Sequence, residues 1–411
     1  MNILLINHYA GSVHHGMEYR PYYLAREWIK QGHKVMILAS SYSHIRTKNM
    51  TVEANYTDEL IDGIHYRWYK TPEHKGNGIG RVKNIISFLR KVGKDANSIT
   101  ESFKPDAVIA SSTYPMDIWS ARRIAKQSNA MLVYEVHDLW PLSPIELGNM
   151  SRWHPFIIWC QIAENHAYKY ADKIVSMLPK TKSHMVKHGM KPEKFHYIPN
   201  GVNLDEWSTI APLPDDVSQA LLKIKQKGLP IIGYAGTFGL ANALDCLLDV
   251  AKQEKNSFEI VLIGKGPEKQ ALQKRIKAEN ISNVTILSSI PKTSMPSFLK
   301  SIDIAYIGLL PQPLFRFGIS PNKLIDYMMA AKPIIMAIDA GNDIVSDVGC
   351  GITTLPSDVK AIGDAIMKLS KLPSEELKKM GEKGNDFILS NQTYPVLAEQ
   401  FITLLEKPHD R

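Results

Sequence analysis

The segment RFGISPNKLIDYMMAAKPII, residues 316–335, places a lysine and an acid where an apolar helix is expected to begin. Lys323 stands near the predicted helix start, where the helix dipole disfavours a positive charge unless an anion is bound there. Asp326 follows three residues later, so both side chains can project from one face of the helix. The pattern predicts that Lys323 contacts phosphates and that Asp326 accepts hydrogen bonds from ribose hydroxyls. A surface ion pair between the two residues is the alternative.

Two strand–turn–helix segments earlier in the second half carry glycines in their turns. IIGYAGTFGLANALDCLL contains Gly236, Thr237 and Gly239, and VLIGKGPEKQAL contains Lys265 between two glycines. Glycine lets a diphosphate approach the backbone, and a helix N-terminus favours its negative charge. The G-x-x-G-x-x-G spacing differs from the G-x-G-x-x-G fingerprint of dinucleotide-binding proteins. The next strand also lacks the acidic residue at its end that NAD binding would need. Each turn is therefore either a phosphate contact or an ordinary turn of an α/β protein.

Two further loops of the second half could contribute backbone contacts to the same ligand. The strand VTILSS runs toward Ile290, where exposed backbone groups could pair with the edge of a base. Gly318, Ile319 and Ser320 form a turn directly before the Lys323 helix. Because ligands of α/β sheets bind beyond the carboxyl ends of strands, we expect these segments to meet in one nucleotide site.

In the first half, YEVHDLWPLSP places His137 and Asp138 directly after an apolar strand. A lone histidine is usually structural or exposed, but this one lies where a ligand is expected. The loop NHYAGSVHHGMEYR, after the first strand, contains Gly16 and Glu18 and either covers a substrate or only connects strand to helix. We therefore predict a functional role for His137.

Short apolar strands alternate with helical segments along the whole chain, which is typical of parallel α/β sheets. The polar stretch 206–227, which contains PLPDD, resembles a linker. We predict two Rossmann-like, doubly wound α/β domains, residues 1–205 and 206–385, facing each other across a cleft. Residues 386–411 are expected to include a helix that packs back toward the N-terminal domain. The predicted strands are 2–8, 34–40, 106–111, 131–137, 173–178, 195–200, 230–236, 259–264, 284–289, 304–310, 332–338 and 351–355.

Composition favours a folded protein with anionic partners. At 411 residues the chain is too long for one core. Its net charge of +8 favours phosphates, acidic lipid or nucleic acid, unless the charge is spread evenly and serves only solubility. Cys160, Cys246 and Cys350 lack metal-ligand spacing, so we expect them to be reduced and the protein to be intracellular. We find no run of ~20 apolar residues and no signal peptide.

Taken together, these motifs resemble the retaining glycosyltransferases of family 4 with the GT-B fold, bacterial surface-polysaccharide branch. The resemblance covers the whole chain. Its carriers, in order, are GMEYRPYYLAREWIKQGHKV, EVHDLWP, IPNGVN, YAGTFGLANALDCLL, LIGKGPEKQAL and SPNKLIDYMMAAKPII. It implies a nucleotide-sugar donor site in the C-terminal domain and an acceptor side in the N-terminal domain, where Gly16, Glu18 and Asp138 stand.

The resemblance also implies roles for single residues. Asp326 stands where the family has its ribose-binding Glu, and Gly318 replaces the sugar-contacting Glu eight residues earlier. Thr237 and Asn242 stand at the positions of the usual basic pair. Lys323 is then the expected contact of the leaving diphosphate.

Arg316 and Lys265 are further candidates for that contact, and backbone amides around 318–321 could replace the lost Glu. His137 would orient a sugar hydroxyl or stabilise charge, so the expected catalytic residues are His137, Lys323 and Arg316.

The implied reaction is transfer with retention from a UDP-sugar, of UDP-N-acetylhexosamine type among others, to a lipid-linked or polysaccharide acceptor. Such reactions build cell-surface glycans such as O-antigen or capsule. No D-x-D occurs in the chain, so we expect neither a metal ion nor a cofactor at the donor site. Alternatives are a UDP-sugar 2-epimerase-like isomerase and a non-catalytic partner subunit. We expect no nucleic-acid binding, because no basic helix with interleaved aromatic residues is present.

The segment GRVKNIISFLRKVGKDA, residues 80–96, predicts a basic amphipathic helix. Such a helix either lies on anionic lipid or packs its apolar face in a core. The resemblance favours lipid, because relatives often act on lipid-linked intermediates at the cytoplasmic membrane face. Aromatic residues in SRWHPFIIWCQ, residues 151–161, could extend that surface. We therefore expect a cytoplasmic protein, peripheral at the inner face of the membrane.

Overall fold

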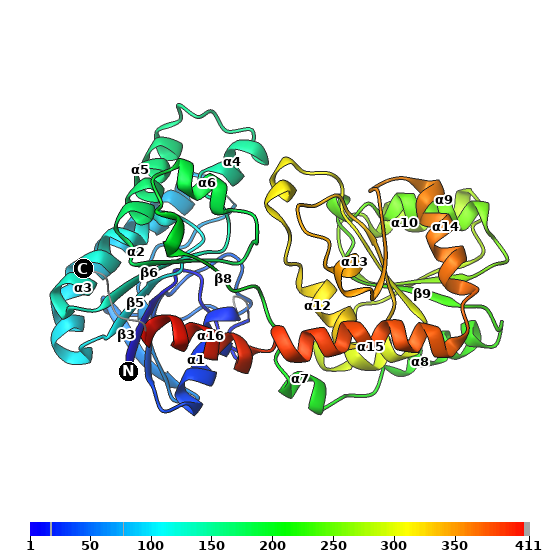
Figure 1. The fold of residues 1–411 in the computed structure, drawn as a ribbon, viewed down its shortest axis with the longest axis horizontal. Helices are drawn as coiled ribbons and strands as arrows, with labels where there is room; N and C mark the ends of the chain where they lie inside the picture. The colour runs from blue at the N-terminus through cyan, green and yellow to red at the C-terminus, as the bar shows by residue number, and fades with distance from the viewer. Residues whose placement is uncertain (17–18, 77, 407–411) are drawn as a thin grey trace. The chain divides into compact units, whose positions relative to one another are not determined.

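The computed structural model describes residues 1–16, 19–76 and 78–406. The chain forms two compact units (Figure 1). Unit 1 comprises residues 1–200 together with the segment that begins at Tyr394, and unit 2 comprises Gly201–Thr393.

Unit 1 is built on one mainly parallel sheet with the strand order β3-β4-β2-β1-β5-β6-β7-β8. Only the β3–β4 pairing among the described strands is antiparallel. The strands are β1 Asn2–Ile6, β2 Lys34–Ser40, β3 Tyr56–Ile61, β4 Ile64–Tyr69, β5 Ala107–Ala110, β6 Met131–Val136, β7 Lys173–Ser176 and β8 Phe195–Tyr197. The helices are α1 Arg20–Lys30, α2 Ile79–Phe103, α3 Ile118–Ser128, α4 Leu142–Glu146, α5 Pro155–Tyr170, α6 Lys182–Lys187 and α16 Tyr394–Glu406, with the short 3-10 helices η1 Pro115–Asp117 and η2 Pro192–Lys194.

Unit 2 has the parallel strand order β11-β10-β9-β12-β13-β14, in which the direction of winding reverses between β9 and β12. The strands are β9 Ile231–Thr237, β10 Glu259–Lys265, β11 Val284–Leu287, β12 Ile304–Gly308, β13 Ile334–Ala337 and β14 Gly351–Thr354. The helices are α7 Asp205–Ser208, α8 Asp215–Lys225, α9 Leu244–Gln253, α10 Lys269–Ala278, α11 Met295–Ser301, α12 Asn322–Met329, α13 Ile344–Val348, α14 Val359–Ser370 and α15 Ser374–Asn391, with the 3-10 helices η3 Leu240–Asn242, η4 Lys292–Ser294 and η5 Pro313–Phe317.

Helices cover both faces of each sheet, which is why the strands are apolar on both sides. In unit 2, alternate residues of β9 point to opposite cores: Ile231 packs in a cluster with α8, α11 and α12, and Ile232 in a cluster with α9 and α14. In unit 1, Ile3 and Leu5 of β1 face a cluster that contains α1 and α16. The prediction of two α/β domains built on mainly parallel sheets is confirmed.

Helix α16 completes the core of unit 1 from the far end of the chain. Its Phe401 ring lies 5.5 Å from the ring of Trp28 on α1, and the Trp28 indole donates a hydrogen bond to the carbonyl of Ala398. The red α16 and the dark-blue α1 therefore lie together in Figure 1.

The interpretation of residues 206–227 as a linker is wrong. This stretch contains α8, whose Val217, Leu221 and Ile224 are buried in the core of unit 2. These three residues are spaced at i, i+4 and i+7, as on one face of a helix, but the turn residues PLPDD before and at the helix start drew the interpretation toward a linker.

The helix predicted at residues 80–96 does not turn its central apolar residues toward lipid, so that part of the interpretation is also wrong. Ile85, Phe88 and Val92 are buried within unit 1, where α2 packs against α3, β2 and β4. Ile79, at the N-terminal end of α2, is instead 75% exposed. Among the described residues, we find no helix with the length and apolar character needed to span a bilayer.

Candidate functional site

A pocket of about 360 Å³ lies in unit 2 at the carboxyl end of β9. This is the side of the sheet and the point of reversed winding where α/β proteins bind ligands. Its walls come from β9, η3, α11 and α12, through Ala235, Gly236, Thr237, Asn242, Met295, Lys323, Asp326 and Tyr327. The structure therefore brings Lys323 and Asp326 together with the first of the predicted glycine turns.

Lys323 is held in this pocket by neutral groups. Its Nζ donates to the Tyr234 hydroxyl at 2.8 Å and to Asn242 Oδ1 at 3.1 Å, and lies 4.1 Å from the centre of the Tyr234 ring. Gly236 provides the space, because a Cβ at that position would lie 2.7 Å from Lys323 Cε. Burial lowers the pKa of Lys323 to about 8. A bound anion would supply the negative partner that these contacts lack.

Asp326 lines the same pocket, and its carboxyl oxygens can still accept hydrogen bonds from a ligand. Burial raises the pKa of Asp326 to about 7, Lys292 lowers it, and Glu206 raises it. Within the described parts of the chain, no group donates a hydrogen bond to this carboxyl and no ion pair joins it to Lys323. The alternative of a Lys323–Asp326 surface pair is therefore not what the structure shows.

The first glycine turn positions Asn242 beside the lysine. The Asn242 side chain donates to the carbonyl of Thr237 at 3.1 Å, and its backbone N–H donates to the carbonyl of Gly239. Gly239 therefore closes the turn, whereas Gly236 and Thr237 line the pocket.

The second glycine turn serves strand packing. A Cβ on Gly264 would collide with the carbonyl oxygen of Gly236, and a Cβ on Gly266 would collide with the carbonyl oxygen of Phe238. Both glycines have positive φ, so other residues would also strain the backbone. This turn is the structural turn that the sequence analysis left as the alternative.

The turn before the Lys323 helix uses its own amides inside the protein. Gly318 donates its N–H to the carbonyl of Phe315 at 2.9 Å, and Ile319 donates its N–H to Asn342 Oδ1 at 2.7 Å. Ser320 follows and is partly buried. These two amides already have acceptors inside the protein and therefore do not replace the lost Glu.

Three other predicted contacts do not line the pocket. Lys265 is exposed at the end of β10, and Arg316 is exposed on η5 with its guanidinium 4.4 Å from the centre of the Phe317 ring. Ile290 packs against the core of unit 2. Tyr234 and Tyr327 also belong to this site but lie inside apolar segments, so sequence reasoning missed them.

In unit 1, His137 belongs to a buried polar network. Its Nε2 lies 2.9 Å from Ser111 Oγ and 3.2 Å from Glu135 Oε2, and Ser111 donates to the same carboxylate oxygen. Arg20 donates to Glu135 Oε1 at 3.0 Å and to the backbone carbonyls of 198–199. Burial raises the pKa of Glu135, but Arg20 and His137 outweigh it and hold the pKa well below its usual range. The carboxylate therefore orients the imidazole.

A second buried acid lies near this network. Asp117 accepts a hydrogen bond from the N–H of Ser112, while its Oδ1 has no partner among the described atoms. Burial raises the pKa of Asp117 to about 7. The sequence analysis did not single out Asp117, because η1 follows β5 without a recognisable motif.

The other first-half candidates have mixed outcomes. Asp138 is exposed and follows His137 directly. Gly16 pairs with Ser12 in an isolated bridge, has a positive φ, and leaves no space for a side chain beside Thr47. Gly16 is therefore explained by the turn itself. Glu18 lies outside the described residues.

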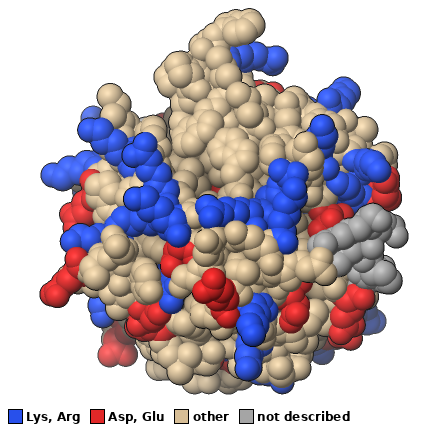
Figure 2. Space-filling view, turned by 90° about the vertical axis from the view of Figure 1, so that its left-hand side faces the viewer, with Lys and Arg blue, Asp and Glu red and all other residues tan. Residues whose placement is uncertain are grey.

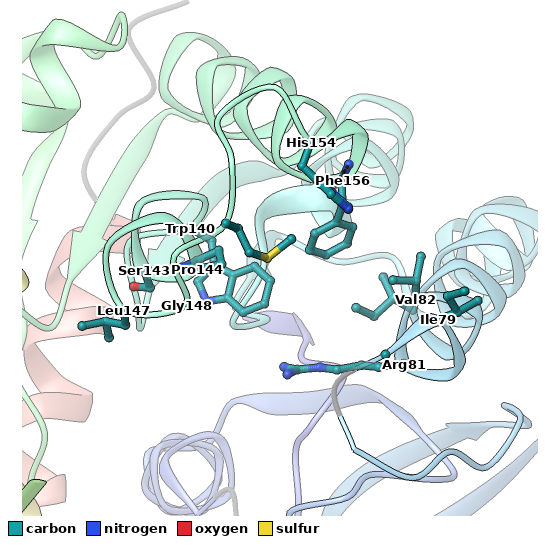
Figure 3. A pocket seen from close by; sticks show the side chains of 13 residues that line it. Ile79, Arg81, Val82, Trp140, Ser143, Pro144, Leu147, Gly148, His154 and Phe156 are labelled. Carbon is teal, nitrogen blue, oxygen red and sulfur yellow. Dashed lines mark hydrogen bonds between the residues drawn. The ribbon is translucent and has the colours of Figure 1, made fainter.

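An apolar pocket of about 610 Å³ lies in unit 1 between the start of α2, helix α4 and the start of α5 (Figure 3). Val82 and Phe156 point toward Trp140 across it, and Arg81 extends along its rim. The Arg81 guanidinium lies 5.5 Å from the centre of the Trp140 ring and donates to the Tyr9 hydroxyl. The remaining lining residues are Gly78, Ile79, Ile85, Ser143, Pro144, Leu147, Gly148, Met150 and His154.

Exposed apolar residues continue from this pocket onto the surface. Ile79 and Leu147 line it and are largely exposed, and Trp153, between α4 and α5, is 85% exposed. Figure 2 shows the side of the molecule that carries α3: lysine and arginine side chains form a band across its middle, below a largely uncharged region. The apolar lining of the pocket, together with Arg81 at its rim, suits an amphiphilic ligand with an anionic group.

Two family models match the chain in succession. Residues 14–206 match the model described as Glycosyltransferase Family 4, and residues 229–371 match the model described as Glycosyl transferases group 1. Together they span most of both units.

One curated relative is the 2-deoxystreptamine N-acetyl-D-glucosaminyltransferase of Niallia circulans. It is 27% identical over 153 residues, which are 36% of this chain and 38% of the relative, so the chain spans well under half of that protein's length.

Two solved structures have a similar fold over almost the whole chain. One is an E. coli structure described as trehalose-6-phosphate bound with UDP-2-fluoro glucose, with a TM-score of 0.71, 12% identity and 99% of each chain covered. The other is Anabaena HepE in complex with UDP and glucose, with a TM-score of 0.63, 14% identity and 99% and 100% of the two chains covered. With its two successive family matches and its two parallel-sheet units, the chain belongs to the glycosyltransferases of the GT-B fold.

Proposed function

We propose that this glycosyltransferase transfers a sugar from a UDP-sugar to a lipid-linked acceptor, with retention at the anomeric carbon, during synthesis of a cell-surface glycan. The observation that carries the proposal is the unit 2 pocket, where a partly buried lysine without an anionic partner and a carboxyl without a donor face the same space.

On the donor side, the Lys323 ammonium contacts the diphosphate, and the Asp326 carboxylate accepts hydrogen bonds from the ribose hydroxyls. The two solved structures similar to this chain hold UDP or a UDP-sugar, which supports UDP as the nucleotide. The name of the curated relative supports an N-acetylhexosamine as the donor sugar. The fixed ammonium would take the place of a metal ion at the diphosphate.

In the proposed step, the bond between the anomeric carbon and the diphosphate oxygen breaks, and its electron pair stays on the diphosphate. An acceptor hydroxyl forms the new carbon–oxygen bond on the same face of the sugar, and its proton passes to the departing diphosphate. Lys323 stabilises the negative charge that develops on the leaving group. His137 contacts the donor sugar, with Glu135 holding the imidazole in place.

On the acceptor side, the apolar pocket of unit 1 binds the hydrocarbon part of the acceptor. Trp140, Val82 and Phe156 supply apolar surface, and Arg81 at the rim supplies positive charge for an anionic phosphate beside the lipid. Exposed Trp153 and Ile79 would then enter the membrane interface, where tryptophan is favoured. This places the proposed membrane contact at the end of α2 rather than along its central stripe.

An epimerase would need a carboxylate base at the sugar, and Glu135 does not suit that role. Proton abstraction needs a carboxylate whose pKa is close to the working pH. Arg20 holds Glu135 ionised with a depressed pKa and occupies one of its oxygens, so Glu135 is a poor base.

The test is a transfer assay with a panel of UDP-sugars and two acceptors that carry the same glycan, one on a prenyl or acyl phosphate and one water-soluble. We expect UDP release and product with the lipid-linked acceptor, a retained anomeric configuration by NMR, and activity in EDTA. A folded protein that transfers no sugar from any UDP-sugar would contradict the proposal. Transfer only to the water-soluble acceptor would contradict the proposal that the acceptor is lipid-linked.

A further inference from the structure

Helices α5 and α6 of unit 1 bring a buried glutamate and two histidines together, away from the pockets described above. One carboxylate oxygen of Glu164 and one ring nitrogen each of His184 and His188 lie within 4.8 Å of one another. The carboxylate comes from the middle of α5, and the two imidazoles come from α6 and its C-terminal cap. The histidines are four residues apart, which puts both rings on one side of the helix.

The carboxylate of Glu164 is 1% exposed, and burying such a charge is costly unless a cation or metal accompanies it. Among the described residues, its only ion-pair partner is His184, which is cationic only when protonated. Its hydrogen-bond donors are neutral: the Tyr168 hydroxyl at 2.9 Å and the Gln161 amide at 2.7 Å. In the part of the chain that the structure describes, no lysine or arginine forms an ion pair with this buried carboxyl group.

The distances suit a small divalent ion. His184 Nε2 lies 3.4 Å from Glu164 Oε1, and the two imidazole rings are centred 4.5 Å apart. Ligand atoms of a tetrahedral site with bonds of about 2.0–2.1 Å are roughly 3.3 Å apart, so closure needs only a small movement of His188. Tyr168 and Gln161 would orient the carboxylate, as outer hydrogen bonds do in metal sites.

We propose that Glu164, His184 and His188 bind a divalent transition-metal ion, Zn²⁺ by their ligand chemistry, which ties α5 to α6. Two nitrogen ligands and one carboxylate leave a fourth position for water. The sequence analysis expected no metal ligands in the chain. In the sequence, His184 and His188 are separated from Glu164 by about twenty residues and do not look like one site. They become a candidate metal site only because the fold brings α6 beside α5.

The site is independent of the donor proposal, because all three residues lie in unit 1 and the UDP pocket lies in unit 2. Folding of unit 1 in every variant is checked by a cooperative unfolding transition followed by tryptophan fluorescence, because Trp28 and Trp68 are fully buried in that unit.

The experiment titrates metal-free full-length protein with Zn²⁺ by calorimetry and with Co²⁺ by visible absorption. We expect one equivalent to bind with tetrahedral Co²⁺ bands, and a rise in Tm with Zn²⁺ that EDTA reverses. His184→Ala and His188→Ala should each weaken binding by at least ~10-fold. The matched control is His166→Ala, a histidine of α5 outside the cluster, which should bind as the wild type does.

Two results would overturn the proposal. One is no stoichiometric binding of Zn²⁺ or Co²⁺ by protein whose unit 1 still unfolds cooperatively. The other is equal binding by His188→Ala and His166→Ala, which would assign the metal to other histidines. Glu164→Gln tests the carboxylate, and if it fails to fold, the two partly exposed histidine variants still decide the question.

Discussion

At the scale of single residues, the protonation state of Lys323 couples the proposed donor site to pH. Burial lowers its pKa to about 8 in the free protein, and a bound diphosphate would raise it again. Nucleotide binding should therefore take up a proton when the pH is above about 8. Asp326, with a pKa of about 7, is already ionised there and does not contribute to the trend.

We predict that the affinity for UDP falls by up to ~10-fold per pH unit above pH 8, measured by calorimetry between pH 8 and 9.5. Lys323→Met should bind UDP weakly and without this slope. Lys368→Met, on an exposed position of α14, should retain the wild-type slope. A wild-type affinity independent of pH over this range would argue against a contact between Lys323 and the diphosphate.

His137 should affect turnover rather than nucleotide binding. Its imidazole is oriented by Glu135 and Ser111 in unit 1, whereas the proposed UDP contacts lie in unit 2. We expect His137→Ala to lower kcat by ~10²-fold or more with an unchanged Kd for UDP. The exposed His14→Ala is the control. Wild-type turnover in the His137 variant would show that this histidine has only a structural role.

Site residues could be predicted from the sequence only where their type and spacing within a short segment indicated a function. Lys323 and Asp326 were predicted as neighbours because a helix repeat places them together, and the structure puts both on one pocket. Tyr234 was missed, because a tyrosine in an apolar strand looks like core. Arg20 was missed as the partner of Glu135, because 115 residues separate them.

At the scale of elements, the strand list was accurate except for the hairpin β3–β4. Its turn is Asp62-Gly63, with positive φ at both residues, which is a strong two-residue hairpin signal. The flanking segments mix charged and aromatic residues, so the strands did not look apolar. Helix α8 was missed because the turn residues PLPDD directly before and at its start resemble a linker.

The proposed acceptor pocket of unit 1 is flanked by two exposed apolar residues, Ile79 at the start of α2 and Trp153 in the α4–α5 loop. We predict that Ile79→Ser with Trp153→Ser lowers kcat/KM for the lipid-linked acceptor at least ~10-fold and reduces binding to anionic vesicles. Transfer to the water-soluble acceptor should stay unchanged. Leu60→Ser, at an equally exposed position on β3 outside the pocket, is the matched control. Equal effects of both substitutions would place the lipid elsewhere.

At the scale of the whole molecule, the chain crosses from one unit to the other twice, and α16 returns to the core of unit 1. Phe401 is fully buried against Trp28. We expect Phe401→Ala to destabilise unit 1 by about 3–5 kcal/mol, measured by denaturant unfolding with a unit 1 probe. Binding of UDP by unit 2 should persist under native conditions. A loss of UDP affinity in proportion to the loss of stability would show that the units fold as one.

The architecture as a whole was the most predictable level, because alternating apolar strands and helices allow few arrangements. The ends of elements and the contacts between distant segments were the least predictable, since they depend on packing that no local pattern records.

The central claim is that unit 2 binds a uridine diphosphate through Lys323 and Asp326 without a metal ion. Calorimetric titration with UDP and with GDP in EDTA tests it most directly. We predict that UDP binds one to one, and that Asp326→Ala weakens it ~10-fold or more, on the scale of about 1.5–3 kcal/mol for hydrogen bonds to a charged group. Asp364→Ala, exposed on α14, should bind normally. Well-folded protein that binds neither nucleotide, or binds UDP equally well without Asp326, would contradict the account.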